Sequence, residues 1–180
     1  MMRIADLEFE VTSCRIEAYC HVEKMQWDIQ IECNSHADGK FHGYKPVLSL
    51  SLFETPAQAF SHWTDLAPRN ARWGDKNDTD VTPSGMLYIF EHTPIFESYA
   101  RCANRGGEMY VKLDGKCDVY FDEQYDTDLE LHLDSPVVFR GVWFGRRPES
   151  DCRKAISHFL NPDDFDYAPT ENGVSMLTPK

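Results

Sequence analysis

The sequence predicts an α+β fold dominated by β-structure: a largely antiparallel sheet, curved or sandwiched, of about nine or ten strands with two helices. Three observations predict it. Apolar and polar residues alternate with a period of two over much of the chain. Helical spacing of apolar residues is confined to about residues 56–66 and 151–160. Most connections between the alternating segments are too short for parallel crossovers, and the 180 residues are expected to form a single domain, 1–180.

The clearest strand signal is a hairpin between residues 14 and 33. Apolar residues occupy every second position before and after Glu23-Lys24. A bend at these two residues would place apolar side chains opposite one another, in the pairs Val22–Met25, Cys20–Trp27, Ala18–Ile29 and Ile16–Ile31, with Arg15 meeting Glu32 on the other face. We therefore expect a ribbon with one buried face, because a slip by one residue would expose every apolar side chain.

Further strands are predicted where the alternation recurs, at residues 4–11, 47–53, 86–90, 95–101, 109–113, 117–121, 129–133, 137–144 and 174–177. The segment 137–144 is almost continuously apolar, which is typical of a central strand. The first helix begins at Thr55-Pro56, where a capping hydroxyl precedes a proline. Ser150 is expected to cap the second helix, which ends near Leu160.

Two rules conflict around Asp114-Gly115. A two-residue turn at this dipeptide would set Leu113 opposite Lys116, whereas apolar pairing sets Leu113 opposite Cys117. Burial of a whole face outweighs one local turn preference. We therefore expect a three-residue loop or a bulge that joins two strands here.

Residues 67–85 are expected to form a long loop, and loops of this length in compact domains are often functional or mobile. The oxygen ligands that alternate from Asp75 to Asp80 resemble the start of a calcium loop. However, Asp80 replaces the glycine of the sharp turn, and Met86 stands where the twelfth-position glutamate is needed. A hydrated acidic loop is the better interpretation.

The six cysteines are expected to be mostly structural. There is no Cys-x-x-Cys pair, and four of the six lie in alternating apolar patterns, where a thiol behaves as a small hydrophobe. Cys14 and Cys33 are predicted to face each other, so a cross-strand disulfide is an alternative. Arg101 and Arg105 flank Cys102 and would lower the pKa of an exposed thiol, but a buried thiol at a strand end is the simpler interpretation.

The net charge of −12 is the strongest global signal. This sign disfavours binding to nucleic acid or anionic membranes, and it speeds encounter with a basic protein partner. Acidity that only keeps the protein soluble is the alternative. No apolar run approaches the ~18–20 residues that cross a bilayer, and the first residues lack the apolar stretch of a signal peptide, so we expect a cytoplasmic protein.

The standard signatures of phosphate-binding loops, dinucleotide-binding turns, zinc proteases and serine hydrolases are absent from the sequence. His36, Asp38 and His42 cluster around a predicted turn and are a weak metal candidate that lacks a fourth ligand, so no metal or other cofactor is expected. Residues 140–147 interleave basic and aromatic side chains. In an acidic protein this segment is best explained as a buried strand that ends in a solvated, ion-paired basic corner.

Three function classes remain. The first is an acidic binding protein of the inhibitor or immunity type, which neutralises a basic partner protein as bacterial immunity proteins neutralise toxins. The second is a small-ligand- or metal-binding β-domain, and the third is an enzyme with a dispersed active site, for which no catalytic residue can be named. The first class is favoured, with an aromatic anchor and seven carboxylates as partner-binding residues: Trp73, Asp75, Asp78, Asp80, Asp122, Glu123, Asp126 and Asp128.

Overall fold

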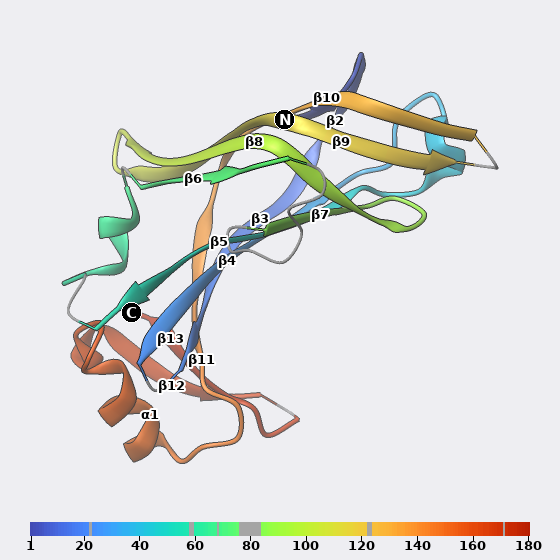
Figure 1. The fold of residues 1–180 in the computed structure, drawn as a ribbon. Coiled ribbons are helices and arrows are strands. Elements are labelled where there is room, and N and C mark those ends of the chain that lie inside the picture. The colour runs from blue at the N-terminus through green and yellow to red at the C-terminus, as the bar shows by residue number, and fades with distance from the viewer. Residues whose placement is uncertain (22, 58–59, 68, 76–83, 122–123, 171) are drawn as a thin grey trace.

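The protein is described here from a computed structural model of residues 1–180, which describes all of them except 22, 58–59, 68, 76–83, 122–123 and 171. The described residues form one sheet of thirteen strands, one α-helix and three short 3-10 helices (Figure 1). The strands are β1 (Met2–Ile4), β2 (Leu7–Phe9), β3 (Val11–Cys20), β4 (Lys24–Cys33), β5 (Val47–Pro56), β6 (Asn70–Trp73), β7 (Ser84–Tyr88), β8 (His92–Arg105), β9 (Glu108–Phe121), β10 (Gln124–Pro136), β11 (Val138–Trp143), β12 (Phe165–Pro169) and β13 (Ser175–Pro179). The helices are α1 (Glu149–Ile156), η1 (Lys40–Gly43), η2 (Trp63–Leu66) and η3 (Pro162–Asp164).

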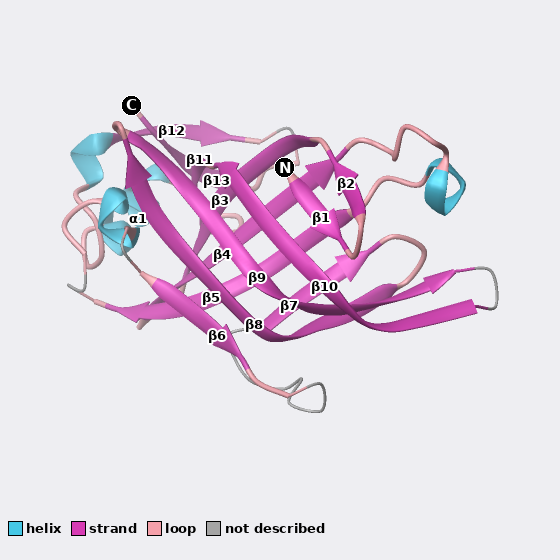
Figure 2. Ribbon diagram, turned by 90° about the horizontal axis from the view of Figure 1, so that it is seen from above, coloured by secondary structure: helices cyan, strands magenta, loops and turns pink. Residues whose placement is uncertain are grey.

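The sheet folds over into two layers that pack face to face. Its order is β12-β13-β11-β3-β4-β5-β7-β8-β9-β10-β1-β2, with β6 beside β8. We call the strands from β12 to β7 the first layer, and β6, β8, β9, β10, β1 and β2 the second layer. Figure 2 shows the strands of the two layers crossing at a steep angle. β8 joins the layers, because its start pairs with β7 and its continuation pairs with β9.

The predicted fold class is confirmed in its main features. The structure is dominated by β-strands, and every strand pair among the described residues is antiparallel except β11 with β3. The strand count was too low. The predicted strand 4–11 is divided among β1, β2 and the start of β3, with a turn that begins at Ala5 at a φ of 51°. In addition, β6 lies within the predicted loop 67–85, and no strand was predicted where β12 lies. β11 lies between β3 and β13, so it is not an edge strand, but it is not buried on both faces, because Val138 is 63% exposed.

The hairpin of β3 and β4 has the predicted buried face but a different register. Cys20 pairs with Met25, Ala18 with Trp27 and Ile16 with Ile29, which is two residues away from the predicted pairs. The turn lies one residue earlier than expected, because the His21 N–H donates to the Lys24 carbonyl at 2.9 Å. The predicted partner of Met25, Val22, lies outside the described residues. Arg15 and Glu32 do meet on the other face, at 3.0 Å.

The predicted helix at about 56–66 is wrong in the part that the structure describes. β5 continues to Pro56, and the Thr55 hydroxyl is buried, where it accepts a hydrogen bond from the Trp27 indole at 3.0 Å. The only helical turn described in this stretch is η2, whose first turn His62 caps. The second helix is confirmed as α1, although it is shorter than 151–160 and Pro148, rather than Ser150, is its N-cap residue.

Asp114-Gly115 is not a turn: β9 runs straight through it. Leu113 pairs with Leu133 of β10 and with Ala100 of β8, whereas Cys117 pairs with Leu129 and Ile95. The predicted pairing of Leu113 with Cys117 is therefore wrong. Gly115 is needed for a close approach of strands, because a Cβ there would lie 2.8 Å from Ser98 Cα and would also overlap the Ser98 hydroxyl.

Replacing Gly115 with alanine is therefore expected to lower the free energy of unfolding by about 1–3 kcal/mol, since overpacking forces the backbones of β8 and β9 apart. Urea unfolding followed by circular dichroism measures this change. Lys112→Ala, on the exposed side of the same strand, is the control and should stay within about 0.5 kcal/mol of the wild type. Equal stability of Gly115→Ala and the wild type would contradict the close packing of Gly115 on Ser98.

One hydrophobic core fills the space between the layers. Trp27 is its largest fully buried side chain, and its ring contacts Phe60 and Phe139 with centroid distances of 5.6 and 5.7 Å. α1 and the C-terminal strands gather at one end of the molecule (Figure 1), where Cys152 and Ile156 are buried. No helix among the described residues has the length and apolar character needed to span a membrane.

Candidate functional site

The outward side of the first layer carries most of the large exposed apolar side chains in the described part of the protein. In β3 and β4 the buried residues, such as Ile16 and Ile29, alternate with residues that point away from the core. We call this surface the outer face; it is formed by Arg15, Glu17, Tyr19, Gln26, Asp28, Gln30, Glu32, Ser49, Ser51, Met86, Tyr88, Val138 and Trp143.

Glu17 organises the centre of the outer face. Its carboxylate accepts hydrogen bonds from the Trp143 indole N–H at 3.1 Å and from the Tyr19 hydroxyl at 3.4 Å. Arg15 forms ion pairs with Glu17 and Glu32 at 3.4 and 3.0 Å. Two aromatic rings are thus held in fixed positions before any ligand arrives, which lowers the entropic cost of binding.

The phenol of Tyr19 stays protonated in this setting. Partial burial raises its pKa, and the nearby negative charges of Glu17 and Asp28 raise it further. The hydroxyl is therefore a hydrogen-bond donor at neutral pH. Tyrosine and tryptophan with a fixed polar group and an accessible ring are the residue types that anchor protein interfaces.

Asp28 supplies negative charge to the same face without a cationic partner among the described residues. Its Oδ1 accepts hydrogen bonds from the Gln26 amide at 3.0 Å and from the Ser51 hydroxyl at 2.9 Å. These donors are neutral, so they position the carboxylate but leave its charge uncompensated. An uncompensated carboxylate beside exposed aromatic rings suits contact with a basic side chain.

Exposed apolar side chains are concentrated on the outer face. Seven large hydrophobic residues are exposed in the described part of the chain, and four of them, Tyr19, Met86, Tyr88 and Val138, belong to this face. Val138 is the most exposed, at 63%. At its edge lies a cavity of about 450 Å³, whose lining includes Arg15, Val138 and Arg140. Such clustering on one surface marks an interaction site more strongly than scattered exposure does.

The residues predicted to bind a partner are not brought together by the described structure. Trp73 lies in the core with only 7% of its surface exposed, and its indole nitrogen has no hydrogen-bond partner among the described residues. Asp75, Asp126 and Asp128 are exposed, and the Asp128 N–H donates to the carboxylate of buried Asp118 at 3.0 Å. The remaining four predicted carboxylates lie outside the described residues: Asp78, Asp80, Asp122 and Glu123.

The weak metal candidate does not form a ligand set. The His36 ring packs edge-on against Phe9 at 5.6 Å, and its Nδ1 accepts the Asp38 N–H at 3.3 Å. His42 lies in the distorted turn η1 with a φ of 50°. Within the part of the chain that the structure describes, no three His, Cys, Asp or Glu residues are arranged to hold a metal ion.

One acid–histidine pair resembles catalytic machinery on the second layer. His132 Nδ1 lies 2.8 Å from Asp114, but its Nε2 faces the Glu130 carboxylate at 3.4 Å. No hydroxyl or thiol among the described residues has a hydrogen bond to this histidine. Cys102 is not a nucleophile either, because burial raises the pKa of its thiol to about 12. These groups do not make a site for nucleophilic catalysis.

Comparison of the chain with protein-family models, curated proteins and solved structures found no match. The outer face was not predicted, because residues 140–147 were interpreted as a buried strand and Trp143 was therefore not a candidate binding residue. The signal that could have found it is the polar parity of residues 15–19, in which Tyr19 is the one large ring on the outward side of the hairpin.

Proposed function

We propose that the protein is a cytoplasmic inhibitor of the immunity type, which binds a basic partner protein through the outer face. The observation that supports this proposal is the pair of aromatic anchors, Trp143 and Tyr19, which Glu17 holds beside the uncompensated charge of Asp28. Interfaces of stable complexes combine such central aromatic anchors with a polar rim.

The charge of the chain supports a basic partner. With 30 acidic residues against 18 basic ones, the protein attracts positively charged proteins and steers their approach. Arg15 does not cancel this effect on the outer face, because Glu17 and Glu32 both pair with it. Steering raises the association rate, while the aromatic anchors slow dissociation.

The test begins with retention of basic proteins from a cell extract on the immobilised wild type and on the variant Tyr19→Ala/Trp143→Ala. A protein retained by the wild type but not by the variant is then purified, and its dissociation constant is measured by calorimetry. Trp143→Ala should weaken binding at least tenfold, about 1.4 kcal/mol, because it removes an anchoring ring. Asp28→Asn should mainly slow association and reduce its salt dependence.

Tyr120→Ala serves as the control, because Tyr120 is an exposed tyrosine of the second layer. It should leave partner affinity unchanged, and urea unfolding should show that the outer-face variants remain folded. Equal affinity of the outer-face variants and Tyr120→Ala would rule out the outer face as the binding site. Retention of no basic protein by the wild type would count against an inhibitor of a basic partner.

A further inference from the structure

A second cavity lies at the end of the molecule that carries α1, away from the centre of the outer face. It measures about 440 Å³ and is bounded by His21 after β3, by the segment that leaves β11, and by α1 with the residues that follow it. Its polar lining residues are His21, Arg146, Arg147, Asp151, Lys154 and His158. A volume of this size is in the range of sites for small molecules, about 300–1,000 Å³.

The cavity gathers positive charge in an acidic protein. Three of its lining residues, Arg146, Arg147 and Lys154, carry positive charge, and one, Asp151, carries negative charge. The chain as a whole has a net charge of −12. A single carboxylate does not balance three converging cations, so a cluster of this composition favours an external anion.

The cations of the cavity are not neutralised from within the described structure. The side chains of Arg146, Arg147 and Lys154 form no ion pair with any described residue, so the ion-paired corner expected at residues 140–147 is not found there. Basic residues elsewhere do pair, as Lys24 does with Glu54 at 2.6 Å. Others, such as Arg3 and Arg101, form no ion pair with a described residue either, so the distinguishing feature of Arg146, Arg147 and Lys154 is that all three line one cavity.

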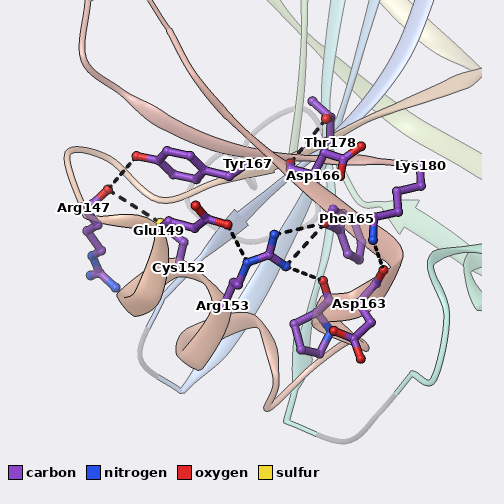
Figure 3. A network of polar contacts seen from close by, with 11 residues as sticks. Arg147, Glu149, Cys152, Arg153, Asp163, Phe165, Asp166, Tyr167, Thr178 and Lys180 are labelled. Atoms are coloured by element: carbon purple, nitrogen blue, oxygen red, sulfur yellow. Dashed lines mark hydrogen bonds and ion pairs between the residues drawn. The ribbon is translucent and has the colours of Figure 1, made fainter.

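Arg147 is held by its main chain, which leaves its guanidinium group available. Its carbonyl accepts hydrogen bonds from the hydroxyls of Tyr167 and Ser175 and from the Cys152 thiol, and its N–H donates to Ser175 at 3.2 Å. Figure 3 shows the Arg147 side chain extending away from this network. The main chain of Arg147 is thus held by hydrogen bonds, while its guanidinium group takes no part in them.

Arg153 of the same helix provides a contrast. Its guanidinium group pairs with Glu149 at 2.7 Å and donates to the carbonyls of Pro162 and Phe165 (Figure 3). It joins α1 to the C-terminal strands and is fully engaged in structure. The helix therefore uses one basic residue to hold the fold and presents another, Lys154, to the cavity.

We propose that this cavity binds a small phosphate ester, whose phosphate group is held by Arg146, Arg147 and Lys154. Arginine is suited to this role because its planar donors match phosphate oxygens two at a time. Asp151 cannot bind the phosphate and instead faces the remainder of the ligand, where it accepts a hydrogen bond from a hydroxyl group. The proposal is independent of partner binding at the outer face.

Isothermal titration calorimetry of the full chain tests this proposal at constant ionic strength. The probes are inorganic phosphate, ribose 5-phosphate and unphosphorylated ribose. Ribose 5-phosphate should bind more tightly than inorganic phosphate, and ribose should not bind. Arg146→Gln/Arg147→Gln should weaken ribose 5-phosphate at least tenfold, and its fold should survive because the contacts of Arg147 that stabilise the structure come from its main chain.

Two further variants distinguish a specific site for phosphate esters from a general attraction of anions by positive charge. Asp151→Asn should tighten inorganic phosphate by about threefold, because it removes a nearby negative charge, and should weaken the preference for the ribose ester. Arg101→Gln removes one positive charge from an exposed position of β8 and should change no affinity. Absence of phosphate-ester binding by the wild type, or an equal loss in Arg101→Gln and the double variant, would overturn the proposal.

Discussion

Replacing Trp27 with alanine is expected to lower the free energy of unfolding by about 3–5 kcal/mol. The Trp27 side chain is fully buried, and its ring contacts Phe60 and Phe139 while its indole N–H donates to the Thr55 hydroxyl. Alanine leaves a large cavity between the layers and removes the indole hydrogen bond. For a domain with a total stability of about 5–15 kcal/mol, this loss takes a large share. Urea unfolding followed by far-ultraviolet circular dichroism measures it.

Two substitutions serve as controls for Trp27→Ala. Trp27→Phe keeps most of the buried apolar area, and the Thr55 hydroxyl still donates to the Met25 carbonyl, so its cost should be about 1–2 kcal/mol. Trp143→Ala removes a ring that is only partly buried and should cost less than Trp27→Ala. A loss below about 1 kcal/mol for Trp27→Ala would show that Trp27 is not the centre of the core.

The fold class could be predicted because strand alternation depends only on which side chains are buried. The hairpin of residues 14–33 shows both the power and the limit of this signal. A shift of one residue would have exposed Ile16 and Ile29, so the buried face was fixed. A shift of two residues leaves each side chain on its own face, and the turn at His21–Lys24 selects the register instead. The pattern therefore predicts faces but not partners.

The two largest errors have a common cause, since local signals were outweighed by contacts distant in sequence. Thr55-Pro56 has the composition of a helix start, yet the Thr55 hydroxyl satisfies the buried indole of Trp27, 28 residues away. Gly115 follows an aspartate as in a hairpin turn, yet it provides space for Ser98 of the neighbouring strand. Thr55 does offer a hydroxyl and Gly115 does lack a side chain, as expected. In both cases, however, a residue distant in sequence determines which structure the residue adopts.

The candidate site was less predictable than the fold. Its central hydrogen bond joins Glu17 and Trp143, which are 126 residues apart and meet only because β11 pairs in parallel with β3. A short connection cannot produce that pairing, so the sequence offered no local evidence for it. The acidic character that favoured a basic partner is distributed over the whole chain, which explains why it indicated a class of function without indicating a surface.

Alkaline pH is expected to destabilise the folded protein through the ionisation of its buried cysteine thiols. Burial raises the thiol pKa to about 12 in four cysteines and to about 11 in a fifth, namely Cys14, Cys33, Cys102, Cys117 and Cys20. In the unfolded chain these thiols ionise near pH 9, so between pH 9 and 11 the folded state retains protons that the unfolded state releases. Stability is therefore complete below pH 9 and falls as pH rises, by up to about 1.4 kcal/mol per unit and thiol.

Because five thiols act in the same direction, the loss of stability above pH 9 should be larger than any one of them would cause. Urea midpoints at pH 8, 9, 10 and 10.5 measure it. Tyrosines and lysines also titrate in this range, so Cys102→Ala is the necessary comparison. It lowers stability at every pH through lost packing, but its decline above pH 9 should be shallower by one thiol's share. Parallel declines in the wild type and Cys102→Ala would show that burial of this thiol does not cause the alkaline instability.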